Sequence, residues 1–241
     1  MALILCLETA TEVCSVALFR DDTLLGLKES SARNVHSSML TLFIESITGE
    51  TGSGLANLDA IAVSMGPGSY TGLRIGVATA KGLCYALDKP MIAVPTLGSM
   101  AAGMNYELKI KNYNGESECD GEVLFCPMID ARRMEVYCAV YNGRGIEVEE
   151  VMAEIIDENS FGHLLVHHRV VFGGEGAEKC KTVLESHPNA MFMDGFRASA
   201  RHMNSLAMAR FNGAEFENLA YFEPFYLKDF VAGLPRVKGL H

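Results

Sequence analysis

Residues 64–82 read SMGPGSYTGLRIGVATAKG, a pattern in which a buried strand ends in a tight turn and a helix follows. The four residues before this stretch, 60–63, are all apolar, as expected of a strand that is covered on both faces. The Gly-Pro-Gly at 66–68 cannot continue a strand, because proline has no amide hydrogen to donate. From Thr71 the apolar residues recur at intervals of four and three, so residues 71–87 are predicted to form a helix with one face against a sheet.

The predicted helix also carries a row of small residues, Gly72, Gly76 and Ala80, at intervals of four. A glycine inside a helix costs about 0.5–1 kcal/mol relative to alanine, so close packing must compensate for it. The row packs either against the chain's own sheet or against a helix of another subunit, and the pattern leaves both interpretations open. A phosphate-binding P-loop is rejected, because no Lys-Ser/Thr pair follows the last glycine and Pro67 removes an amide donor.

Over its first hundred residues the chain alternates apolar runs with polar turns. The expected elements are strands at 3–8, 13–19 and 24–29, a helix that Asn34 or Ser37 caps and that ends near Thr48, a strand at 60–65, the helix at 71–87, a strand at 91–94 and a helix from Thr96 to Met104. Short turns join the first three strands, which predicts an antiparallel meander. This order of elements is that of a ribonuclease-H-like domain, in which helices cover both faces of a mixed sheet.

The second half repeats this theme in a shorter form after a polar segment at 105–121, which is predicted to be a linker. It also begins with a three-strand meander, although no residue-level repeat is visible. The expected elements are strands at 122–130, 134–141, 145–150, 170–172 and 191–193, a helix from the glycines at 173–176 to about Ser186, and a helix at 200–211. We therefore predict an α/β protein with two ribonuclease-H-like domains, at 1–104 and 105–241, the second one degenerate.

The composition is that of a globular protein. Hydrophobic residues make up 49% of the 241, enough for full cores, and no apolar run is long enough to span a membrane. Glu8 interrupts the apolar start too early for a signal peptide, and the seven cysteines show no CxxC spacing, so we expect a cytoplasmic protein with reduced core cysteines. With 20 basic and 30 acidic residues, the chain needs a basic partner for any contact with nucleic acid.

Several segments together carry a family resemblance. They are 7–18 (LETATEVCSVAL), 36–37 (HS), 66–82, 129–137 (IDARRMEVY), 173–177 (GGEGA) and 224–227 (PFYL). In these segments the chain resembles the bacterial TsaB (YeaZ) family, glycoprotease-like proteins of the actin/Hsp70/sugar-kinase-like superfamily. The resemblance implies two ribonuclease-H-like halves in an actin-like ATPase fold. It also implies a role in forming N6-threonylcarbamoyladenosine on the tRNA adenosine beside the anticodon.

The same resemblance implies partners for the chain. It is expected to be the non-catalytic partner, or scaffold, of a TsaD-type transferase, with a TsaE-type ATPase as third component and with tRNA contacted only through the complex. The alternative is an ATP-binding small-molecule kinase or ATPase of the same superfamily. No magnesium-binding carboxylate pair, P-loop lysine or catalytic base can be assembled from the sequence. We therefore predict no catalytic residues and no peptidase activity.

No metal site is predicted. In the catalytic relative two metal-ligand histidines lie four residues apart at the start of a helix, and the resemblance places Thr96 and Met100 at those positions. Neither is a good ligand for such a metal. His163 and His167 are also four residues apart, but apolar residues separate them and no carboxylate is expected on that face. We therefore interpret them as surface or core histidines.

The end of the first strand offers a candidate nucleotide site, because superfamily members place an aspartate there that organises magnesium near the phosphates. This chain has a glutamate instead. The candidate nucleotide-binding residues are Glu8, Thr9, Thr11, Gly173, Gly174 and Gly176. Ordinary turns explain these residues better, so ATP or ADP is expected only within a complex. Arg132 and Arg133 are interpreted as exposed ion pairs with the carboxylates beside them, with tRNA contact as the alternative.

The helices predicted at 36–48 and 71–87 carry more apolar surface than one sheet can cover. They are expected to pair with the same two helices of a second copy, which gives a homodimer when the chain is alone, or with those of the catalytic relative. The residues predicted at this interface are Leu40, Phe43, Ile47, Gly72, Leu73, Gly76, Val77 and Ala80.

Overall fold

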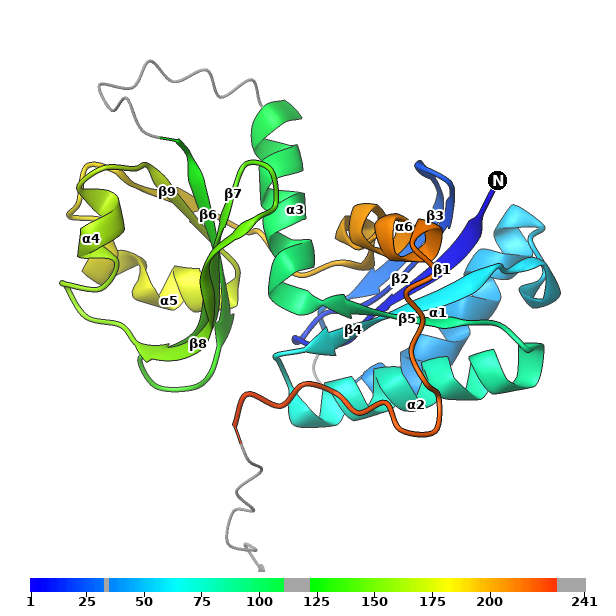
Figure 1. Cartoon of the computed structure of the whole chain (residues 1–241). Coiled ribbons are helices and arrows are strands. Elements are labelled where there is room, and N and C mark those ends of the chain that lie inside the picture. Colours follow the sequence, from blue (N-terminus) through cyan, green and yellow to red (C-terminus); the bar gives the residue numbers. More distant parts are fainter. Residues whose placement is uncertain (33–34, 111–121, 229–241) are drawn as a thin grey trace, which may run out of the picture.

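Two five-stranded sheets with the same strand order form the framework of the part of the chain that the structure describes (Figure 1). The computed structural model describes residues 1–32, 35–110 and 122–228. Its strands are β1 (Leu3–Glu8), β2 (Cys14–Arg20), β3 (Thr23–Ser30), β4 (Ala60–Gly66), β5 (Met91–Pro95), β6 (Leu124–Asp130), β7 (Glu135–Asn142), β8 (Glu147–Ile155), β9 (Val170–Gly173) and β10 (Ala190–Met193). Its helices are α1 (His36–Thr51), α2 (Tyr70–Leu87), α3 (Thr96–Ile110), α4 (Gly162–Leu165), α5 (Glu175–Leu184) and α6 (Asn204–Asn212), with 3-10 turns η1 (Leu55–Asn57) and η2 (Ala200–His202). The predicted α/β class, with helix-flanked mixed sheets, is confirmed.

The first sheet has the order β3-β2-β1-β4-β5, in which β1 to β3 are antiparallel and β4 and β5 run parallel to β1. Side chains of β1 alternate between two cores, as the two-residue period of a strand requires. Leu3, Leu5 and Leu7 pack against α1 and α2, whereas Ile4 and Cys6 face α6. Helices therefore cover both faces of this sheet, α1 and α2 on one side and α6 on the other (Figure 1).

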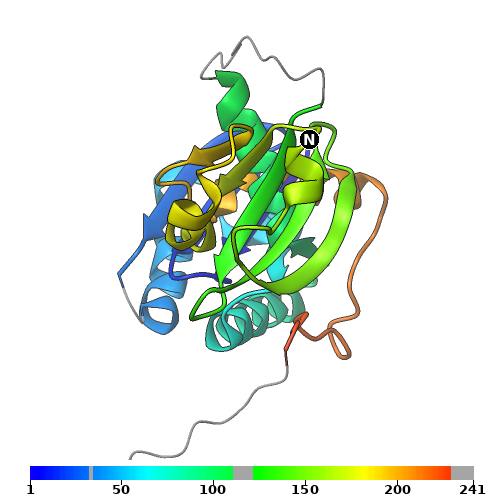
Figure 2. The same ribbon diagram turned by 90° about the vertical axis from the view of Figure 1, so that its left-hand side faces the viewer.

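The second sheet repeats that order as β8-β7-β6-β9-β10, so β6 takes the place of β1 and α5 takes the place of α2. Its helices are shorter. Helix α4 has 4 residues where α1 has 16, and α5 has 10 where α2 has 18. Figure 2 views this half from the side on which α4 and α5 cover the sheet. The repeated meander expected from the sequence is thus present in the topology.

Helix α3 lies between the two halves and contacts strands of both sheets (Figure 1). It extends to Ile110, so the start of the predicted linker is helical, and residues 111–121 lie outside the described residues. After β10 the chain returns to the first half, where Ala200, Met203 and Ala207 pack against the first sheet. Division into domains at residue 104 stays a prediction, and the structure adds that η2 and α6 belong with the first core.

The two long helices of the first half begin differently. The hydroxyl of Ser69 accepts a hydrogen bond from the amide of Gly72 and so caps α2. Helix α1 follows Val35 and has no capping side chain among the described residues. The cap predicted at Ser37 is therefore wrong, and Asn34 lies outside the described residues.

The cysteines of the described residues are free and buried, as expected for reduced core residues: Cys6, Cys14, Cys84, Cys126, Cys138 and Cys180. Burial raises the pKa of the Cys6 thiol to about 12, so this thiol is not a nucleophile at neutral pH. In the ranges that the structure describes, no helix is both long and apolar enough to cross a membrane.

Candidate functional site

The small-residue row of α2 faces the chain's own first half. A Cβ at Gly76 would lie 2.2 Å from the hydroxyl oxygen of Thr9, and a Cβ at Gly72 would lie 2.1 Å from the Thr9 carbonyl oxygen. The helix can pass over the loop after β1 only because these positions are glycine. The other predicted interface residues of this helix are buried as well: Leu73, Val77 and Ala80. The assignment of this row to a contact with a partner is therefore corrected, since it packs against Thr9 in its own domain.

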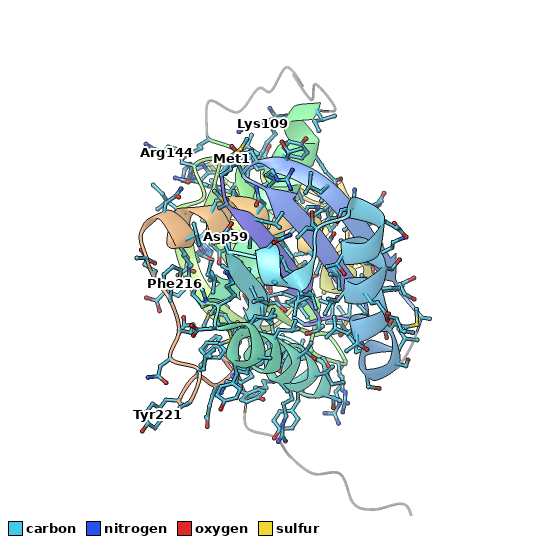
Figure 3. All side chains as sticks on the ribbon, turned by 90° about the vertical axis from the view of Figure 1, so that its right-hand side faces the viewer. Met1, Asp59, Lys109, Arg144, Phe216 and Tyr221 are labelled. Carbon is cyan, nitrogen blue, oxygen red and sulfur yellow. The ribbon has the colours of Figure 1, made fainter. Side chains whose placement is uncertain are left out.

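Helices α1 and α2 turn a different set of residues to solvent. Of the predicted contacts on α1, Leu40 and Ile47 are buried in the core and Phe43 is half-buried at its edge. The exposed surface, which we call the α1–α2 face, consists of Thr41, Leu42, Ala78, Gly82, Tyr85 and Ala86. Leu42 is 53% exposed and Tyr85 is 85% exposed. In Figure 3, α1 stands upright beside α2, which is seen nearly end-on. The sequence held a signal for this face, because Ala78, Gly82 and Ala86 also recur at intervals of four.

Glu8 ends β1 with its carboxyl group fully buried at the junction of the two halves. Its Oε1 accepts a hydrogen bond of 2.7 Å from the amide of Ala10, whereas its Oε2 has no hydrogen-bond partner among the described residues. Burial raises the pKa of Glu8 to about 7, and the nearby Glu175 carboxylate acts in the same direction. Glu8 is therefore partly protonated at neutral pH, which makes it a weaker magnesium ligand than an ionised aspartate.

The second half brings a further carboxyl group to this junction, that of Glu175 at the start of α5. Both of its oxygens are buried and lack a hydrogen bond among the described residues, and the guanidinium Nε of Arg197 lies 3.9 Å from Oε1. Burial raises the pKa of Glu175 as well. Glu175 is not among the site residues predicted from the sequence, although a carboxylate that directly follows two glycines at a helix start was a visible signal. Two carboxyl groups from opposite halves thus lie at the predicted nucleotide site, and in their ionised form they oppose the approach of a phosphate chain.

The remaining candidate nucleotide residues have structural contacts. A Cβ at Gly173 would lie 2.9 Å from the side chain of Met104, and one at Gly174 would lie 2.4 Å from the Met128 carbonyl oxygen. One at Gly176 would lie 2.9 Å from the side chain of Met128. In the first half the amide of Thr9 donates to the hydroxyl of Ser64, and the hydroxyl of Thr11 accepts from the amide of Val13. Nucleotide binding by these residues stays a prediction.

A cavity of about 690 Å³ lies elsewhere between the two halves. Its apolar wall includes Met65, Pro95 and Leu206, and Arg144 and Glu147 are among its polar lining residues. The volume suits a small-molecule ligand. None of the candidate nucleotide residues lines it, so the cavity and the predicted nucleotide site are separate places.

Thr96 and Met100, which the family resemblance places where the catalytic relative has histidine ligands, both have packing roles. The hydroxyl of Thr96 accepts a hydrogen bond of 3.1 Å from the amide of Gly66, and Met100 is buried in the apolar cluster between α3 and the second sheet. His163 pairs with Glu149 of β8, so the expectation that no carboxylate lies near it is wrong. Across residues 1–32, 35–110 and 122–228, no group of three or more His, Cys, Asp or Glu side chains is placed to hold a metal ion.

The β6–β7 hairpin presents Arg132 and Arg133 at its tip, where both side chains are exposed. The ion pairs predicted for them are not formed within the described residues. Asp130 pairs instead with Lys179 of α5, and Glu135 pairs with Lys228 near the end of the described chain. The interpretation of the two arginines as ion pairs with their neighbours is therefore wrong, because lysines from distant segments occupy both carboxylates.

Residues 214–228 follow α6 and run back across the first half as an irregular segment, which we call the strap (orange to red in Figure 1). The amide of Glu217 donates to the carbonyl of Met91 at the edge strand β5, with a distance of 2.9 Å. The amide of Phe225 donates to the carbonyl of Met65 at 2.7 Å. Backbone hydrogen bonds thus fix the strap to the ends of two strands.

The last part of the strap connects the two halves. The ring of Tyr226 lies 4.8 Å from the ring of Tyr70, centroid to centroid, and the guanidinium of Arg74 lies 5.3 Å from the centroid of the Tyr70 ring. Lys228 then reaches Glu135 of the second half. The strap therefore joins the start of α2 to the β6–β7 hairpin, a role that the motif at 224–227 did not predict.

Comparison with known proteins adds evidence from the whole chain. The family model described as TsaD, tRNA N6-adenosine threonylcarbamoyltransferase, matches residues 26–233. The chain is 38% identical over 162 residues to the tRNA threonylcarbamoyladenosine biosynthesis protein TsaB of Escherichia coli, and 34% identical over 151 residues to that of Bacillus subtilis. These matches cover 64% and 63% of this chain, and 64% and 60% of the relatives. The matched segments thus span less than two thirds of these relatives' length.

A solved structure supports the same fold over nearly the whole chain. It is described as an uncharacterized protein with similarity to peptidase YeaZ from Pseudomonas aeruginosa. The likeness has a TM-score of 0.75 at 25% sequence identity and covers 95% of this chain and 100% of the other. Both halves are therefore present in a related structure.

Proposed function

This chain belongs to the family of tRNA N6-adenosine threonylcarbamoyltransferases, and on that premise we propose that it is the non-catalytic subunit of a complex that forms N6-threonylcarbamoyladenosine on tRNA. The relatives named TsaB support the proposal. The observation that carries it is the packing role of Thr96 and Met100, the residues that the family resemblance places at the positions of the metal-ligand histidines. Both side chains serve packing, so this chain contributes no histidine pair to the reaction.

The α1–α2 face is the surface that we propose docks on a TsaD-type transferase. Leu42 and Tyr85 are large, exposed side chains of the kind that anchor protein interfaces. Between them Ala78 and Gly82 leave the helix backbone open to close approach, since a Cβ at Gly82 would have no heavy atom within 4 Å. A partner helix can therefore lie close to α2 without clashing with long side chains.

Co-expression with a tagged TsaD-type transferase tests this proposal. Ala78→Arg places a charged side chain in the middle of the α1–α2 face and should abolish retention of the chain on the tagged partner, with an unchanged melting temperature. Thr182→Arg is the matched control, because Thr182 is exposed on α5 of the second half, away from this face. Retention of Ala78→Arg at the wild-type level would show that the transferase does not dock on this face.

The finer parts of the proposal concern the other members of the complex. We infer that the chain alone forms a homodimer through the same α1–α2 face, that a TsaE-type ATPase joins as third component, and that ATP or ADP binds only in the complex. We also place the protein in the cytoplasm. Light scattering checks the homodimer directly, because Ala78→Arg should convert a dimer into a folded monomer.

A further inference from the structure

At the tip of the β6–β7 hairpin the backbone conformation is unfavourable for the two residues that occupy it. Arg132 and Arg133 adopt left-handed conformations, with φ of 73° and 53°. Residues with a Cβ rarely adopt such angles, and a hairpin turn of this kind prefers asparagine or glycine. Folding alone therefore does not explain two arginines at this tip, which suggests that their side chains have a use.

The acidic side chains that flank the hairpin tip are paired with lysines, so they do not neutralise the two arginines. Asp130 is paired with Lys179 and Glu135 with Lys228, and Lys179 also donates to the backbone carbonyl of Glu135. The guanidinium groups at the tip are exposed and have no partner among the described residues. The hairpin thus holds two positive charges without a counter-ion among the residues that the structure describes, in a chain whose formal net charge is −10.

Cationic and aromatic side chains continue from the hairpin along the strap. Lys228 is followed by Tyr226, whose ring lies against Tyr70, and Arg74 lies over the other ring of that pair. We call this series the cationic strip; its members are Arg132, Arg133, Lys228, Tyr226, Tyr70 and Arg74. It ends at the first turns of α2, which is the helix that carries part of the α1–α2 face. A partner docked on that face would therefore lie beside the strip.

We propose that the cationic strip binds the phosphate backbone of RNA held by the complex of this chain with its catalytic relative. The inference rests on the proposed function, from which the RNA is drawn. Arginine suits the role because its planar guanidinium can donate two hydrogen bonds to one phosphate. The pair of tyrosine rings among these cations favours RNA over an acidic protein surface, since bases stack on aromatic rings. The contacts position the RNA and read no sequence.

The test uses the complex of the full chain with a TsaD-type transferase and a fluorescent, unmodified tRNA transcript. Replacing both hairpin arginines, Arg132→Ala with Arg133→Ala, removes two phosphate contacts. The slope of log Kd against log salt concentration should then become shallower by about 1.4 to 1.8. Arg132→Lys with Arg133→Lys retains both charges and should retain the wild-type slope.

A matched control removes two exposed cations elsewhere, Arg20→Ala with Lys109→Ala. Lys109 is in the last turn of α3, and Figure 3 shows it far from Tyr221 of the strap. The overall charge of this control equals that of the hairpin variant. Its Kd and salt slope should stay close to those of the wild-type chain.

Retention of the transferase is measured first on the same samples, so that two failures can be told apart. A wild-type chain that does not retain the transferase would overturn the proposed function. A hairpin variant that retains the transferase and binds tRNA with an unchanged slope would overturn the cationic strip alone. A hairpin variant that loses the transferase itself would show a protein contact at the hairpin and would also overturn RNA binding there.

Discussion

The two halves have the same strand order, yet the carboxyl group at the end of the central strand is buried in one half and exposed in the other. In the first half β1 ends in Glu8, whose carboxyl group is fully buried and has a pKa near 7. In the second half β6 ends in Asp130, which is exposed and paired with Lys179. Repeated topology thus fixes where a carboxyl group lies, whereas the elements that cover it decide how far the group is buried.

The loops that follow these strands differ for a related reason. The loop after β1 is buried, because the glycine row of α2 lets that helix lie directly over Thr9. The tip after β6 stays open to solvent and carries Arg132 and Arg133. In the first half, the long helix α2 therefore covers the loop after the central strand. In the second half, the shorter helix α5 leaves the corresponding tip, with its two arginines, exposed. The predictions below test this difference, from the largest expected effect to the smallest.

Gly72→Ala should have the largest effect. The new methyl group would lie 2.1 Å from the carbonyl oxygen of Thr9, and a backbone atom in the core cannot move aside easily. We expect a loss of about 3 kcal/mol in the free energy of unfolding, the upper end of the usual range for overpacking. Urea denaturation followed by circular dichroism measures it.

Two further glycines sharpen this comparison. Gly176→Ala, in the corresponding helix α5, meets Cβ of Met128 and Cγ1 of Val136 at 2.9 Å and a backbone carbon of Met128 at 3.0 Å. These contacts are longer than the 2.1 Å at Gly72, so the loss should be smaller, about 1–2 kcal/mol. Gly82→Ala is the control on α2 itself and should stabilise the chain by about 0.5–1 kcal/mol, since no atom lies within 4 Å. Equal losses of unfolding free energy in Gly72→Ala and Gly82→Ala would contradict the close packing of α2 over the loop after β1.

Glu8→Gln should change how stability depends on pH. Folding raises the pKa of Glu8 from 4.5 to about 7, so between these values the folded chain holds a proton that the unfolded chain releases. Stability is therefore lost as pH rises through this range, by up to about 3 kcal/mol. Glutamine cannot ionise, so Glu8→Gln should not show this loss of stability. The difference in unfolding free energy between Glu8→Gln and the wild-type chain should therefore move in favour of the variant from pH 4.5 to pH 8. Urea denaturation at the two pH values measures it.

Asp130→Asn provides the contrast from the second half. It breaks an exposed ion pair, so the free energy of unfolding should change by less than about 1 kcal/mol at either pH. A pH dependence in Asp130→Asn as large as that in Glu8→Gln would remove the distinction between the two carboxyl groups.

Local patterns in the sequence predicted most of the fold, because strand and helix periods depend on neighbouring residues. The predicted bounds of β1, 3–8, coincide with the observed Leu3–Glu8, and the helix predicted at 71–87 differs from α2 by one residue. The site was predicted less well, since its wrong assignments depend on contacts between distant segments. As a sequence pattern, the glycine row is equally consistent with packing against a partner helix and with packing against the loop after β1. Nothing near Glu135 in the sequence indicates that Lys228 reaches it.

Arg133→Gly should have a small stabilising effect, and it concerns the open tip of the second half. A φ of 53° costs an L-residue about 1–2 kcal/mol, whereas glycine adopts it freely but loses about 0.5–1 kcal/mol of chain entropy on folding. The net expectation is a gain of about 0.5–1 kcal/mol, seen as a small rise in the melting temperature.

The same variant removes one cation of the cationic strip, so the transferase complex should bind tRNA less tightly. A variant that is more stable and binds RNA less well would mean that the arginine is retained for contact and not for folding. Lower stability in Arg133→Gly would instead show that the guanidinium supports the hairpin, and the two halves would then differ less than their exposed and buried loops suggest.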